Sequence, residues 1–111
     1  MTYLIRLADF SRYPAGRVEA DGDRSGKLYR DTILVPKLRD ALSSGTTLTV
    51  DMNGIRLAGS SFFEEAFGGL VREGLFDKQD VLQSLQLIGS RPGGRDLVSE
   101  VKGYICDAKP Q

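Results

Sequence analysis

Two adjacent serines, Ser60 and Ser61, stand between a segment that alternates apolar and polar residues and a segment with helical spacing. The alternating segment ends at Asp51. A helix N-terminus offers unpaired amides and a positive dipole, so it stabilises an anion or a phosphoryl group there. The added charge, about −1.5 to −2, would disrupt an apolar contact through Phe62 or Ile55. The pattern is typical of a phosphoserine switch and equally of plain N-capping.

A second polar segment, Gly22 to Lys27, contains parts of two ion-binding motifs. A phosphate-binding loop has four residues between its glycines, and this segment has one fewer. Such a loop also has a Ser or Thr after the lysine, and here that position is Leu28. A calcium loop starting at Asp21 needs a bidentate Glu at its twelfth position, which is Thr32. We therefore expect a solvated turn that caps a helix, with Ser25 as the N-cap.

Most of the cations are arginines, and several of them lie close in sequence to carboxylates. The interleaved charges are Arg12, Arg17, Arg24 and Arg30 with Glu19, Asp21, Asp23 and Asp31. This favours a local salt-bridge network over an anion site. Glu64 and Glu65 are neighbours on one helix and are expected to point in different directions, unlike a glycosidase pair. We assign Glu64 to a capping box with Ser61.

The composition excludes several classes of function. The 111 residues carry 15 Lys+Arg and 15 Asp+Glu, so the net charge is zero, and there is no His. Zero net charge argues against nucleic acid or an anionic membrane as partner. Without His, and with Cys106 as the single cysteine, His-dependent catalysis and zinc sites are excluded. We expect no enzyme, no cofactor and no metal, and we expect Cys106 to be buried.

The chain is expected to be one domain over residues 1–111. Its length suits one domain, and 41% hydrophobic residues are enough for a core. The N-terminal segment is interrupted by Arg6 and Asp9, which argues against a signal peptide, and no apolar run reaches about 20 residues. We therefore predict a cytoplasmic protein.

Three segments alternate with a period of two, which predicts strands covered on one face. They are residues 3–8, 47–52 and 85–88. Helical patterns follow at residues 25–43, 60–74, 77–83 and 94–106. This order predicts an α/β fold, β-α-β-α-β-α, with an open, mostly parallel sheet and helices mainly on one face. Residues 14–26 are expected to form a loop or an irregular hairpin, and the fold is expected to have an N-terminal strand or hairpin in addition to these elements. The uncovered face would carry Arg6, Thr47, Thr49 and Gln86.

Two helices contain residues that disfavour helix. Pro36 lacks a backbone donor and should kink the first. In the second helix, Gly68 and Gly69 each reduce helix stability by about 1 kcal/mol relative to Ala. A close approach of the helix backbone to the sheet would explain why glycine stands at both positions.

The segment from Asp51 to Phe67 resembles the signature of the STAS-like domain family of unknown function. That family is similar to the STAS domains of bacterial anti-sigma-factor antagonists. Further matching pieces are Gly16-Arg17, Gly22, Ser25-Gly26, Arg30, Leu34-Val35-Pro36, Phe67-Gly68-Gly69-Leu70, residues 77–87 and the terminal helix. The resemblance also implies that Pro36 is tolerated in the first helix.

In those antagonists an Asp-Ser-Ser-Gly loop presents a serine to a GHKL-type, histidine-kinase-like ATPase, which phosphorylates it. By this resemblance Ser61 corresponds to the phosphoacceptor and Ser60 to its neighbour. Gly59 and Phe62 replace the flanking Asp and Gly. The resemblance implies a non-catalytic regulatory module whose partner is such an ATPase or an anti-sigma-type regulator. The expected partner surface is Asp51, Gly54, Ile55, Gly59, Phe62 and Glu65, together with Gly22 and Ser25.

Two alternatives stay open. One is a sensor that binds a small anion or ligand at the same helix N-terminus without phosphorylation. The other is a structural subunit that forms a homodimer through the polar sheet face or a sheet edge.

Overall fold

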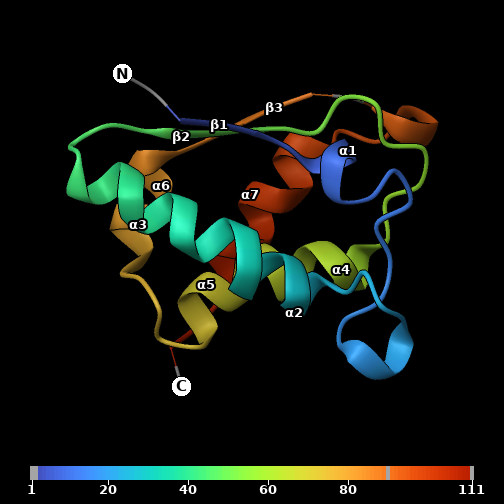
Figure 1. The fold of residues 1–111 in the computed structure, drawn as a ribbon, viewed down its shortest axis with the longest axis horizontal. Coiled ribbons are helices and arrows are strands. Elements are labelled where there is room, and N and C mark those ends of the chain that lie inside the picture. The colour runs from blue at the N-terminus through green and yellow to red at the C-terminus, as the bar shows by residue number, and fades with distance from the viewer. Residues whose placement is uncertain (1–2, 90, 111) are drawn as a thin grey trace.

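The structure is a computed structural model that describes residues 3–89 and 91–110. The described residues form three strands, β1 (Tyr3–Arg6), β2 (Leu48–Asp51) and β3 (Leu85–Ile88). They make one parallel sheet in the order β1-β2-β3, with Ile5, Val50 and Leu87 in register (Figure 1). The predicted α/β fold with an open parallel sheet is confirmed. Each strand lies within its predicted segment, but the first ends at Arg6, because Leu7 and Ala8 belong to a short helix that was not predicted.

The labelled α-helices are short, but several of them join end to end into longer helices. They are α1 (Leu7–Phe10), α2 (Gly26–Tyr29), α3 (Val35–Ser43), α4 (Ser60–Phe63), α5 (Gly69–Arg72), α6 (Lys78–Ser84) and α7 (Leu97–Asp107). A π-helical segment, Arg30–Leu34, joins α2 to α3, and another, Glu64–Gly68, joins α4 to α5. Residues 26–43 and 60–72 are therefore two continuous helices, which we call the first and second long helices.

The helices lie on one side of the sheet (Figure 1). Leu48, Val50 and Leu87 point into the buried core on that side. The opposite face carries the polar residues Arg6, Thr49 and Gln86, as predicted. Thr47 precedes β2 and is half-buried. Leu4 and Ile88 add exposed apolar side chains to the open face, at 51% and 45% exposure.

The second long helix runs through the core and is buried nearly all round. Its rings pack against those of the first long helix, with the Tyr29 and Phe62 centroids 5.8 Å apart. A Cβ on Gly26 would lie 2.3 Å from the Phe62 carbonyl oxygen, so the two backbones touch there. On another side, a Cβ on Gly68 would lie 3.3 Å from the Tyr104 carbonyl oxygen of α7. A helix enclosed in this way needs apolar residues on most of its surface, and any charge that it buries must be paired.

Pro36 fits the first long helix because of the π turn that precedes it. Val35 N–H donates to the carbonyl of Arg30, five residues back, so the helix is one residue wider there. A proline ring clashes with the carbonyl four residues earlier in a regular helix. The structure thus has a π turn directly before Pro36, at the place where a kink was predicted.

Three details of the sequence analysis are corrected. Residues 14–26 form a loop with one 3-10 turn, Glu19–Asp21, which is one of the two predicted forms, but the additional N-terminal strand or hairpin is wrong, since none occurs in the described residues. The last helix begins at Leu97 instead of Gly94, because Asp96 caps it by accepting from Ser99 N–H at 3.2 Å. Cys106 is exposed, not buried. In the described residues no helix is long and apolar enough to cross a bilayer.

Candidate functional site

Ser60 and Ser61 occupy the first two positions of the second long helix, and both are exposed. Gly59 is the residue before the helix, and no side chain caps the helix at that position. Ser61 therefore lies inside the helix, and the capping box with Glu64 is wrong. The prediction that the serine pair stands at the start of a helix after β2 is confirmed.

The loop between β2 and this helix, residues 52–59, is held on both sides. Arg56 N–H donates to the carbonyl of Arg12 at 2.6 Å, and Gly59 N–H donates to that of Pro14 at 2.9 Å. From the other side, the Arg95 guanidinium donates to the carbonyl of Ala58 at 2.6 Å. The backbone that leads into the serines is thus fixed by two separate parts of the chain.

Arg95 is itself held by α7. Its Nε and Nη2 atoms donate to the two carboxylate oxygens of Glu100 at 2.9 and 2.8 Å. This two-point contact orients the guanidinium toward the loop. Its hydrogen bonds also lower the pKa of Glu100 below the ordinary value, so the carboxylate stays charged. No local sequence pattern indicates this contact, because Arg95 and Ala58 lie far apart in the chain.

The expected partner surface divides into exposed and buried residues. Gly22 and Gly54 are exposed, and Asp51 and Gly59 are partly exposed. Four others are buried: Ser25, Ile55, Phe62 and Glu65. Because Phe62 and Ile55 belong to the core, a charge on Ser61 cannot act by disrupting a surface contact through them.

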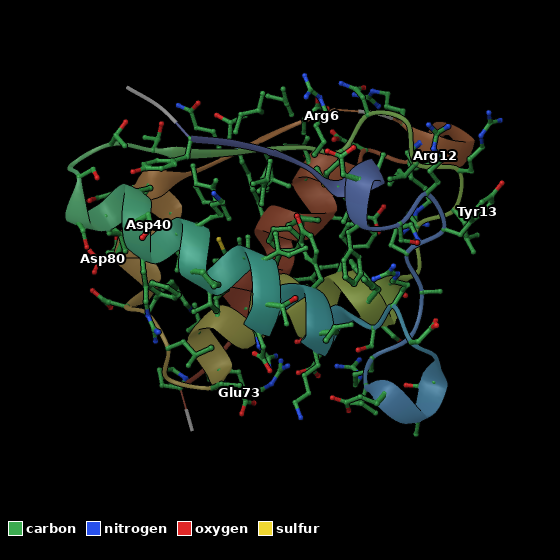
Figure 2. All side chains as sticks on the ribbon, in the orientation of Figure 1. Arg6, Arg12, Tyr13, Asp40, Glu73 and Asp80 are labelled. Atoms are coloured by element: carbon green, nitrogen blue, oxygen red, sulfur yellow. The ribbon has the colours of Figure 1, made fainter. Side chains whose placement is uncertain are left out.

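Exposed apolar side chains near the serines come from residues that the sequence analysis did not select. Leu57 is 52% exposed and precedes Ser60 by three residues. Tyr13 is 62% exposed and belongs to the segment that pairs with the loop through Arg12 and Pro14. Figure 2 shows Tyr13 pointing away from the body of the molecule, with Arg12 beside it. Alternation in strands and spacing in helices give no information about such loop residues.

Residues 16–26 form a loop whose ends are close together. Gly26 N–H donates to Gly16 O at 3.0 Å, and Lys27 N–H donates to Arg17 O at 3.1 Å. The Asp21 carboxylate accepts from the backbone N–H groups of Val18 and Arg17, and these bonds lower its pKa. Its carboxylate thus stabilises its own loop. At the end of this loop Ser25 accepts from Leu28 N–H at 3.1 Å, which confirms it as an N-cap.

A cluster of charges connects this loop to both long helices. Arg30 donates to the Glu65 carboxylate at 2.6 Å and to the Glu65 carbonyl at 2.9 Å. Arg17 and Arg72 each contact both Glu64 and Glu65, with Arg17 lying 3.3 Å and Arg72 3.4 Å from the Glu65 carboxylate. The two glutamates therefore share arginines, and the expectation that they point apart is wrong.

Burial and hydrogen bonding oppose each other at the centre of this cluster. Burial raises the pKa of Glu65, but hydrogen bonds from Arg30 and Arg17 outweigh it, so the pKa is lowered. Gly68 and Gly69 make room for these side chains: a Cβ on Gly69 would lie 2.3 Å from Arg30 Nη1, and one on Gly68 would lie 2.8 Å from Glu64 Oε2. The glycines thus serve the charged cluster and the contact with α7, not an approach to the sheet. Arg30 and Asp31 do form the predicted local pair, at 3.1 Å.

The model of the STAS-like domain of unknown function (DUF4325) matches residues 25–94, so the chain belongs to this family. The match begins at the Ser25 cap and includes both long helices and Ser60–Ser61. Neither the curated proteins nor the solved structures give a match. In the described residues no group of three or more His, Cys, Asp or Glu side chains could hold a metal ion.

Proposed function

We propose that this protein is a non-catalytic interaction module resembling an anti-sigma-factor antagonist, which docks a protein partner through the surface around Ser60 and Ser61. The observation that carries the proposal is that both serines are exposed at the start of a helix that neither of them caps. Their hydroxyls are thus not needed by the fold. The balanced net charge supports a protein partner rather than nucleic acid.

The docking surface that we propose consists of Tyr13, Gly54, Leu57, Ser60 and Ser61. Leu57 and Tyr13 supply exposed apolar area. Aromatic side chains of this kind often contribute strongly to protein interfaces. In the proposed surface, Leu57 and Tyr13 replace Phe62 and Ile55, which are buried.

The partner that we propose is a GHKL-type ATPase, and the phosphoacceptor is Ser61. In the transfer, the Ser61 hydroxyl oxygen bonds to the γ-phosphorus of ATP, ADP leaves, and the hydroxyl proton passes to a base of the partner. The helix dipole favours the resulting negative charge at this position. The same charge, on the surface that we propose for docking, would weaken an apolar contact with the partner, which makes phosphorylation a release signal.

The test incubates the full chain with ATP and each purified GHKL-type ATPase of the same genome, followed by intact-mass measurement and peptide sequencing. We expect one phosphoryl group, lost in Ser61→Ala and kept in Ser43→Ala, a change at an exposed serine of the first long helix. Ser61→Asp should weaken ATPase binding at least tenfold. If no ATPase modifies or binds the chain, the proposal is wrong. Stabilisation by inorganic phosphate, or a dimer in light scattering, would then favour the anion sensor or the structural subunit.

A further inference from the structure

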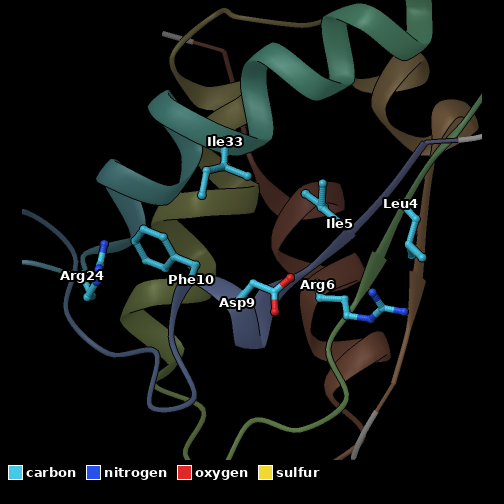
Figure 3. A pocket seen from close by; sticks show the side chains of 7 residues that line it. All are labelled: Leu4, Ile5, Arg6, Asp9, Phe10, Arg24 and Ile33. Carbon is cyan, nitrogen blue, oxygen red and sulfur yellow. The ribbon is translucent and has the colours of Figure 1, made fainter.

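The outer edge of β1 borders a groove that the proposed function does not use. β1 pairs with β2 on one side, and the other side faces a groove of about 360 Å³ between β1, α1 and the first long helix (Figure 3). Leu4, Ile5 and Arg6 form the strand side of the groove, and Phe10 and Ile33 form the opposite side. A groove of this volume beside a free strand edge is large enough to bind several side chains of an extended segment.

Two backbone N–H groups of β1, those of Leu4 and Arg6, lie on its outer edge. Tyr3 N–H donates to Thr47 O at 3.1 Å, so Tyr3 faces β2. Because these groups alternate along a parallel strand, the N–H groups of Leu4 and Arg6 point away from β2, toward the groove side. Natural edge strands are often protected by a short length, charged side chains, Pro or a bulge. β1 is short, at four residues, and carries the charged Arg6, but it has no Pro and it pairs with β2 in continuous register without a bulge.

The side chains of the groove select an occupant by polarity. Ile5, Phe10 and Ile33 are partly buried apolar residues that pack against the core. At the rim, Arg24 lies over the Phe10 ring at 5.2 Å, and the Arg6 side chain is 60% exposed, with its Nε 4.0 Å from Asp51.

The residues that line the groove therefore include two guanidinium groups and one carboxylate, Asp9, while the Asp51 carboxylate lies outside the lining, 4.0 Å from Arg6 Nε. Both guanidiniums keep donors available for a carboxylate. This charge balance favours an occupant with acidic residues beside apolar ones.

The opposite edge of the sheet differs. The groove beside β3 is lined by Gln83, Gln86 and the single cation Lys102, together with leucines and Ile88. It has no aromatic side chain and no arginine. The two edges thus share free backbone groups but not the charge pattern, so the β3 edge is a matched control.

We propose that β1 binds an extended acidic segment of a partner protein as an added strand, with apolar side chains against Phe10 and Ile33 and carboxylates on Arg24 and Arg6. Main-chain pairing would supply affinity, and the alternate side chains that enter the groove would supply selectivity. Most of the groove lies outside residues 25–94, which the family model matches.

The experiment uses the full chain and a labelled probe peptide, Asp-Glu-Val-Thr-Val-Thr-Val-Asp. We expect it to bind at least tenfold more tightly than a peptide with Lys in place of Asp and Glu. N-methylation of alternate amides should also weaken binding at least tenfold, because it blocks strand pairing. In NMR, amide exchange of Leu4 and Arg6 should slow at least fivefold on binding, and that of Gln86 should not change.

Variants locate the site. Arg24→Glu should weaken binding of the acidic probe at least tenfold and improve binding of the Lys peptide, a reversal that a folding defect would not give. Lys102→Glu at the β3 groove should leave both affinities unchanged. Equal binding of the N-methylated peptide, or equal loss in Arg24→Glu and Lys102→Glu, would overturn the proposal. So would a concentration-dependent dimer that Arg24→Glu dissociates, because a second copy would then occupy the edge.

Discussion

The two long helices both begin next to serine, but their serines are used differently. Ser25 is 1% exposed and accepts a hydrogen bond from Leu28 N–H, so it belongs to the fold. Ser60 and Ser61 are exposed, and no side chain caps their helix. The second long helix is instead stabilised further along, where Glu65 meets Arg30 and where its aromatic rings are buried. A helix that is stabilised by contacts along its middle therefore does not need a side-chain cap, and the residues at its N-terminus can serve a function other than folding.

The largest expected effect tests whether the second helix is held from its middle. Glu65→Gln removes the charge that faces the buried Arg30, and we expect a loss of about 2 to 4 kcal/mol in urea unfolding at pH 7. This loss is smaller than the roughly 3 to 5 kcal/mol expected when a buried charge is left with no partner, because Asp31 still contacts Arg30 at 3.1 Å. Asp31→Asn is the control, since this carboxylate is exposed and should cost less than about 1 kcal/mol. Equal losses would contradict our description of the cluster.

The same variant should change how stability depends on pH. The pKa of Glu65 is lowered in the folded protein, so its stabilising contribution is complete above the ordinary glutamate pKa and is lost as pH falls through the lowered value. As the pH is lowered from 7, the free energies of unfolding of the wild-type protein and of Glu65→Gln should become equal in acid. A difference that stays constant to pH 3 would mean that charge is not the source of the loss.

A smaller effect is expected from closing the space that the glycines leave. Gly69→Ala places a methyl group 2.3 Å from Arg30 Nη1, and we expect a loss of about 1 to 3 kcal/mol from overpacking. Gly103→Ala in α7 is the matched control, because nothing lies within 4 Å of its Cβ position. There alanine should stabilise by up to about 1 kcal/mol through helix propensity. If both substitutions stabilise, Gly69 is not required by the cluster.

The smallest effects compare the two helix starts directly. Ser25→Ala removes a buried cap and should cost about 1 kcal/mol. Ser61→Ala, at an exposed position without a capping bond, should stay within about 0.5 kcal/mol of the wild-type protein. Thermal and urea unfolding of both variants would measure the difference. A large loss in Ser61→Ala would mean that the fold depends on this hydroxyl, which would weaken the proposed function.

Local patterns predicted the elements well, because strand alternation and helix caps are properties of neighbouring residues. The three strands, the Ser25 cap and the start of the helix at Ser60 were all readable in this way. The failures at the second long helix have a common physical cause. The spacing of Ser61 and Glu64 fits a capping box, but Glu64 is bound by Arg17 and Arg72, and no local pattern shows which distant arginine will approach. The burial of Phe62 likewise depends on contact with Gly26 from another helix.

The π turns were not predicted either, because one extra residue only shifts the phase of the apolar pattern, and such a shift is hard to detect in helices of this length. The unusual features near them, Pro36 and the Gly68–Gly69 pair, were visible but could not be explained. Each is accounted for by a contact that forms only in the fold: a widened turn before Pro36, and side chains of the charged cluster against the glycines. The single-domain assignment, the partner and the phosphoacceptor stay predictions.

The π turn at Arg30–Leu34 also has an implication for how the chain length can vary among relatives. A chain shorter by one residue at this turn could close it into a regular helix and keep Ser25 and Leu38 facing their present neighbours. Loss of a residue elsewhere in the same helix would rotate everything beyond it by about 100° and expose the buried side. Insertions and deletions in related sequences should therefore concentrate at this turn.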